Sequence, residues 1–98
     1  MSMQLEIITP EAKVFSGEVE AVQLPGLDGL FQVLKGHAPI ISALTKGHVK
    51  VDLKQAVEAG QFSSSMISTD NSNSKVIRVE INGGVVEMLN DKVIVLAE

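Results

Sequence analysis

Hydrophobic and polar residues alternate with a period of two in two segments of the chain. Every second side chain is apolar over residues 48–54, and the same pattern returns over residues 77–82. A period of two is typical of a strand that buries one face. We therefore expect a strand in each segment, with Val49, Val51 and Leu53 on the buried face of the first.

The last part of the chain predicts a hairpin. Asn90 and Asp91 favour turns, and they separate the apolar segments 85–89 and 92–97. The second of these segments is apolar at nearly every position, which is typical of a strand covered on both faces. We expect the final strand to be buried on both sides.

Earlier in the chain the predicted strands are shorter. Within the segment 18–24 the alternation slips by one step between Ala21 and Val22, which indicates a β-bulge. Turn-forming residues separate this segment from its neighbours. The remaining early strands are expected over residues 5–8, 14–15, 30–34 and from 40 onward, with turns at 9–10, 16–17, 25–29 and 35–36.

Short strands with turns between them favour an all-β fold. We expect a flattened two-sheet β-sandwich or barrel of short, mostly antiparallel strands, forming a single domain over residues 1–98. The only aromatic residues are three Phe, so the core is expected to be aliphatic. The segment 55–75 has no sustained period and predicts an irregular inserted loop, with a helical turn over 55–59 that Gly60 would end.

Composition excludes several classes of function. The net charge is −4 and no basic stripe is present, which argues against a nucleic-acid partner. The chain has no cysteine and therefore no disulfide, thiolate or cysteine-based zinc site. The first residues show no signal peptide, and the longest apolar run, 93–97, is too short to cross a bilayer. Membrane association is therefore expected to go through a partner protein.

No catalytic, metal-binding or cofactor-binding motif is found. His37 and His48 lack metal-ligand spacing, and His48 lies on the polar face of its predicted strand. The sequence has no Gly-x-Ser-x-Gly elbow and no phosphate-binding Gly-Lys-Ser/Thr. The segment 70–73 resembles a calcium loop but lacks its glycine and distal glutamate. We expect a protein with no catalytic residue and no cofactor.

Two other readings remain open at this point. Lys92 is expected at the tip of the hairpin, where lipoyl and biotinyl carrier domains carry their modified lysine, although Met-Lys-Met is absent. An adhesion or ligand-binding sandwich is the third possibility, disfavoured because such sites rely on exposed aromatic residues.

One run is more specific than the rest. Residues 28–41, Asp-Gly-Leu-Phe-Gln-Val-Leu-Lys-Gly-His-Ala-Pro-Ile-Ile, resemble the epsilon subunit of F-type ATP synthases. The resemblance continues over residues 8–20, 43–51, 82–87 and 92–98, and only 55–75 falls outside it. It implies a non-catalytic subunit of the rotor, the central stalk, that couples proton-driven rotation of the c-ring to ATP synthesis.

The resemblance also implies partners, a location and contact residues. The partners would be the gamma subunit and the polar loops of the c-ring, at the cytoplasmic face of the bacterial inner membrane. Asp28, Gly29 and Leu30 would face the c-ring. The gamma side would include Thr9, Gly36, His37, Ala38, Pro39 and Ser42.

Four departures from the family pattern change these expectations. Leu30 stands where many relatives carry an acidic residue, and Lys35 stands where proline is usual, which would loosen the turn before Gly36. The segment 55–75 is longer than expected. The given sequence ends at Glu98, before the two-helix hairpin that can restrain ATP hydrolysis, so we expect neither that inhibition nor ATP binding.

Overall fold

The described part of the chain consists of strands and turns. The computed structural model describes residues 2–58, 60–62 and 64–98. The strands within these ranges are β1 (Met3–Ile8), β2 (Lys13–Gly26), β3 (Gly29–Leu34), β4 (Ile40–Leu44), β5 (Gly47–Leu53), β6 (Ile67–Thr69), β7 (Val76–Ile81), β8 (Gly84–Leu89) and β9 (Lys92–Ala97).

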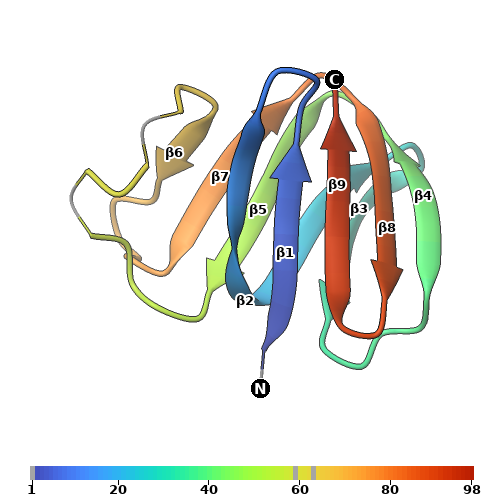
Figure 1. Cartoon of the computed structure of the whole chain (residues 1–98), viewed down its shortest axis with the longest axis horizontal. Coiled ribbons are helices and arrows are strands. Elements are labelled where there is room, and N and C mark those ends of the chain that lie inside the picture. Colours follow the sequence, from blue (N-terminus) through green and yellow to red (C-terminus); the bar gives the residue numbers. More distant parts are fainter. Residues whose placement is uncertain (1, 59, 63) are drawn as a thin grey trace.

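The strands form two layers that share β2 (Figure 1). The first layer contains β4, β8, β9, β1 and the N-terminal half of β2, and the second contains β3, the C-terminal half of β2, β5, β7 and β6. All pairs are antiparallel except β1–β9. The layers also meet where Gly26 pairs with Leu44, so the sheet nearly closes on itself. The predicted all-β flattened sandwich is confirmed.

The core lies between the two layers and is aliphatic, as expected. Alternate residues of each strand point into it, because successive side chains of a strand face opposite sides. Val49, Val51 and Leu53 of β5 are buried, as are Ile77 and the other inward residues of β7. Removal of these side chains from water is the main force that holds the layers together.

β2 corrects one predicted turn. It runs without interruption through Ser16 and Gly17, because β1 pairs with this stretch and Gly17 lies opposite Leu5. A Cβ atom on Gly17 would lie 3.2 Å from the Phe15 ring, so the glycine serves packing rather than a turn. The predicted bulge is confirmed: the register against β5 shifts between Val19 and Ala21, and Ala21 and Val22 are both buried.

β8 and β9 form the predicted hairpin. Asn90 and Asp91 both have positive φ, 53° and 61°, which is the backbone of a two-residue type I′ turn. The expected burial of β9 on both faces is wrong, because Leu96 is 47% exposed and Ile94 is only half-buried. In the described part of the chain no other element lies over the outer face of this layer.

The segment 55–75 is more ordered than predicted. It contains β6, which pairs with β7 at the edge of the second layer. Val57, Phe62, Met66 and Ile67 pack against the core, and the rings of Phe15 and Phe62 lie 5.9 Å apart. The expected helical turn is not formed by residues 55–58, and its last residue, Ala59, lies outside the described residues. Apart from β6, the described residues of the segment form no strand or helix, but these apolar side chains pack the segment onto the core.

Candidate docking surfaces

The loop between β3 and β4 begins with a tight turn. The backbone N–H of His37 donates to the carbonyl oxygen of Leu34 at 3.0 Å, and Gly36 has φ 85°. A positive φ at the third position is typical of a type II turn, and the turn expected at residues 35–36 is formed. The Nδ1 atom of His37 lies 2.7 Å from the carbonyl oxygen of Ala38 and carries the proton between them, because a carbonyl oxygen only accepts.

This loop is tied to the β8–β9 turn. One carboxylate oxygen of Asp91 accepts from Lys35 Nζ and the other accepts from the backbone N–H of Gly36, each at 2.8 Å. The ammonium and the N–H hold the pKa of Asp91 below its ordinary value. The expected loosening at Lys35 is therefore wrong for this structure, because the lysine side chain is held by Asp91.

The outer face of the first layer carries an apolar surface that the sequence interpretation missed. Ala43, Val85, Leu96 and Ile8 are neighbours on four adjacent strands, β4, β8, β9 and β1. The exposed apolar side chains on this side include Ile41, which is 78% exposed. We define the apolar face by its seven members: Ile8, Ile41, Ala43, Val85, Leu89, Ile94 and Leu96.

Charged side chains interrupt this surface at only a few points. Glu87 lies between Ile41 and Ile94, and Glu6 lies on the other side of Ile94. In the sequence, the uniformly apolar pattern of β9 is the signal for this surface. The same pattern is typical of a strand buried within the domain, which is why it predicts burial on both faces. An exposed apolar patch with a polar rim is characteristic of a protein interaction site.

The outer face of the second layer is polar by comparison. The row across its strands consists of Gln32, Gln23, Lys50, Arg78 and Ser68. A solvated sheet face usually has this composition. Leu30 and Leu34 of β3 are exposed on this side, but the strands beside β3 carry polar side chains, so the apolar face of the first layer is the candidate docking surface.

The predicted gamma-side residues do not all lie together. The segment from Gly36 to Pro39 adjoins the apolar face through a groove of about 450 Å³ lined by Pro39, Ile40, Ile41, Glu87, Met88 and Leu89. Ser42 is half-buried and alternates with Ile41 and Ala43, so its side chain lies on the opposite side of β4. Thr9 lies in the β1–β2 turn, where its hydroxyl is 3.2 Å from both the N–H and the carbonyl oxygen of Ala12. That turn is at the far end of the strands from the β3–β4 loop (Figure 1).

The predicted c-ring residues form the β2–β3 hairpin. Gly26 pairs with Gly29, which leaves Leu27 and Asp28 as a two-residue tip. Gly29 has φ 125°, and Leu27 and Leu30 are both 67% exposed. This hairpin therefore presents one carboxylate between two leucines.

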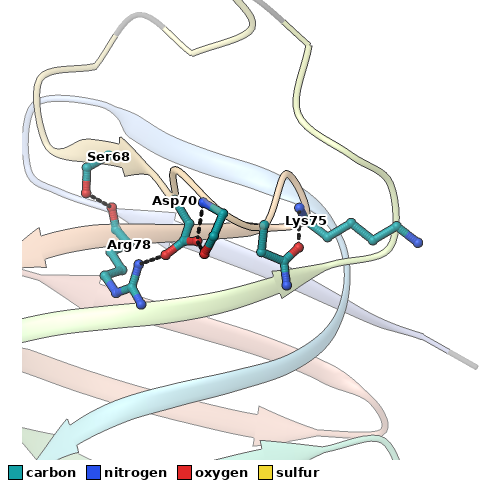
Figure 2. A network of polar contacts seen from close by, with 6 residues as sticks. Ser68, Asp70, Lys75 and Arg78 are labelled. Carbon is teal, nitrogen blue, oxygen red and sulfur yellow. Dashed lines mark hydrogen bonds and ion pairs between the residues drawn. The ribbon is translucent and has the colours of Figure 1, made fainter.

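The described residues show a polar network on the second layer but no metal cluster. Asp70 accepts a hydrogen bond from Arg78 (Figure 2), with 2.9 Å between the two atoms, and Ser72 also donates to Asp70. These contacts lower the pKa of Asp70 to about 2, with the Arg78 hydrogen bond as the largest cause. Among residues 2–58, 60–62 and 64–98 no three His, Asp or Glu side chains come together as metal ligands would. No helix that could span a membrane is found among them.

Lys92, the residue of the carrier alternative, is the first residue of β9 rather than part of the turn tip. It pairs with Leu89 on one side and with Gln4 on the other. Its backbone is therefore part of the sheet.

Comparison with solved structures shows where this fold occurs. A chain of the Euglena gracilis mitochondrial ATP synthase (OSCP/F1/c-ring, rotational state 1) has a TM-score of 0.71 at 17% identity, covering 98% of this chain and 50% of that chain. A chain of the Tetrahymena thermophila mitochondrial ATP synthase (central stalk/c-ring) has a TM-score of 0.63 at 14% identity, with 99% and 63% covered. At these identities the likeness shows a shared fold.

Sequence comparison shows the family. Residues 2–98 match the family described as ATP synthase, Delta/Epsilon chain, beta-sandwich domain. The ATP synthase epsilon chain of Chlorobium limicola is 39% identical over 97 residues, 99% of this chain and 90% of that protein. The epsilon chain of Chlorobaculum tepidum is 40% identical over 94 residues, 96% and 86% of the two chains. These matches do not favour the carrier alternative. The chain belongs to the delta/epsilon family of ATP synthase subunits, among its epsilon chains.

Proposed function

We propose that this chain is a non-catalytic rotor subunit that couples rotation of the c-ring to ATP synthesis by docking onto gamma and the c-ring. The single observation that carries the proposal is the apolar face, which the domain leaves uncovered in the described structure. The sequence relatives are epsilon chains, and the fold occurs in the central stalk/c-ring part of a mitochondrial ATP synthase. In this role the catalysis and the nucleotide sites belong to other subunits.

The apolar face and the adjoining loop of Gly36, His37, Ala38 and Pro39 form the proposed gamma surface. Ile41 and Leu89 flank the groove beside Pro39, so an apolar side chain of gamma would enter it. Glu87 and the exposed His37 would supply polar contacts around it. Thr9 and Ser42 remain predicted contacts, with Thr9 at the opposite end of the strands.

The β2–β3 hairpin forms the proposed c-ring surface. Asp28 is exposed at its tip, with Gly29 beside it and Leu30 exposed on the strand that follows. Asp28 would accept hydrogen bonds from polar loops, and the two exposed leucines at 27 and 30 would add apolar contact. In this role the subunit would lie at the cytoplasmic face of the bacterial inner membrane, held there through its partners.

Titration calorimetry with purified gamma tests the proposal. We expect saturable one-to-one binding at micromolar concentration or tighter. No heat of binding at that concentration, from protein whose melting transition shows it to be folded, would contradict the assignment of gamma as the partner.

A further inference from the structure

The link between Asp91 and the 35–36 turn joins two parts of the chain that are far apart in sequence. Both oxygens of the Asp91 carboxylate are engaged, one by a side-chain ammonium and one by a backbone N–H. Lys35 and Asp91 are each about one-third exposed at the side chain, so the contact is only partly screened by water. Hydrogen bonds to a charged acceptor are stronger than neutral ones.

Asp91 itself is held rigidly by its backbone. It occupies the third position of the type I′ turn, and Asn90 and Asp91 are flanked by the paired residues Leu89 and Lys92. The backbone N–H of Gln4 donates to the carbonyl oxygen of Asp91 at 3.0 Å. The carboxylate therefore projects from a fixed point of the first layer.

The turn that Asp91 holds has no rigid residue of its own. Lys35 occupies the second position of the turn, where proline would restrict φ to about −65°. Lysine leaves this torsion free, and Gly36 is the least restricted residue of all. A Lys-Gly pair would leave the following residues, His37 to Pro39, poorly oriented unless another contact restrained the turn.

We infer that Asp91 is a positioning residue that replaces a rigid turn residue and holds the loop of Gly36, His37, Ala38 and Pro39 beside the apolar face in its docking conformation. Asp91 acts through Lys35 and Gly36 rather than by touching a partner. This inference rests on the proposed docking to gamma, since the loop is part of that surface.

The test uses a substitution that keeps the hairpin. Asp91→Gly turns the tip into Asn-Gly, the pair most favoured in a type I′ turn, and removes only the carboxylate. We expect amide hydrogen exchange at Gly36 and His37 to become faster, and the Kd for gamma to rise about threefold. Asp91→Asn, which also tolerates positive φ, should weaken binding by a smaller factor because it keeps an acceptor oxygen.

The decisive arm is a rescue. In the Lys35→Pro/Asp91→Gly double variant, proline restricts the turn directly, so we expect slow exchange at His37 and wild-type affinity to return. Glu80→Gln, on the polar outer face of the second layer, also removes one carboxylate and is the matched control. It should change neither the amide exchange at Gly36 and His37 nor the Kd for gamma. Thermal melts of all variants confirm that each is folded.

The outcomes separate this inference from the proposed function. Unchanged exchange at Gly36 in the Asp91→Gly variant would overturn the inference, whatever gamma does. Faster exchange with unchanged gamma affinity would overturn the link to docking. Failure of proline to restore affinity, when Lys35→Pro alone binds normally, would also overturn it. If the wild-type protein does not bind gamma, the proposed function fails, and with it the docking role of Asp91.

Discussion

The guanidinium of Arg78 donates a 2.9 Å hydrogen bond to Asp70 and so joins β7 to the turn that follows β6 (Figure 2). Asp70 titrates at about 2 in the folded protein, below its ordinary value of 3.8. Because the folded pKa is the lower one, the stabilisation is present above the ordinary value and is lost as the pH falls through about 2. We expect the protection of the β6 amides, measured relative to their intrinsic exchange rate at each pH, to decrease as the pH falls across this range, with NMR following the Asp70 carboxyl. Asp70→Asn should remove this pH dependence of exchange at β6. An ordinary pKa for Asp70 would contradict the prediction.

Two glycines with positive φ are expected to respond very differently to alanine. A Cβ atom on Gly84 would collide with the carbonyl oxygen of Leu96 on β9, whereas a Cβ atom on Gly29 would meet nothing within 4 Å. Both positions have backbone strain for a non-glycine residue, of about 1–3 kcal/mol. We therefore expect Gly29→Ala to cost about that amount in the free energy of unfolding, and Gly84→Ala to cost clearly more or to prevent folding. Urea titrations measure both, and equal costs would mean that the strands separate easily at Gly84.

A single charge on the apolar face should weaken gamma binding without unfolding the domain. Ile41 is 78% exposed and lies opposite Glu87, so Ile41→Lys costs little in the free domain and adds an attractive cross-strand pair. Buried in an interface, the ammonium would be costly, and we expect the Kd for gamma to rise about tenfold or more. Gln32→Lys, on the outer face of the other layer, is the matched control and should bind as wild type. Equal losses would show that the apolar face is not the gamma surface.

The two histidines give a second test of the docking surface. His37 lies in the loop beside the groove, while His48 is exposed on the polar outer face, opposite Glu80. We expect His37→Ala to weaken gamma binding about three- to tenfold and His48→Ala to leave it unchanged. Calorimetry at one pH compares them directly. Equal effects of the two substitutions would remove the reason for assigning the loop to the interface.

Truncation of Phe62 should show that the segment 55–75 belongs to the domain. Its ring is half-buried, packs against the core and lies 5.9 Å from the ring of Phe15. We expect Phe62→Ala to lower the free energy of unfolding by about 1–3 kcal/mol, less than a fully buried ring would cost. Ser65→Ala, at an exposed position of the same segment, is the control and should have little effect. A neutral Phe62→Ala would favour the interpretation of this segment as an idle loop.

Several features followed from the sequence because neighbouring residues determine them. Strict alternation predicted the buried faces of β5 and β7, since a strand buries every second side chain. Asn90 and Asp91 predicted the β8–β9 turn, because these two residue types tolerate positive φ. The bulge near Ala21 also followed from a local slip in the pattern.

Other features depended on contacts between distant residues. Gly17 follows a serine and is a residue type that favours turns. Only its pairing with Leu5 makes it part of a strand. The apolar pattern of β9 could not distinguish a second buried layer from an exposed docking face. That distinction depends on whether another element covers the strand.

The sequence alone determined that this is an all-β domain with an aliphatic core, and the resemblance over residues 28–41 indicated its family. Tertiary structure decided where the predicted docking residues stand, since it placed the β3–β4 loop beside the groove and the β1–β2 turn at the other end of the strands (Figure 1). It also decided that Lys35 is held, because Asp91, 56 residues later, reaches the same turn. Patterns along a chain report local conformation, whereas a surface or an ion pair exists only after strands far apart in sequence have packed together.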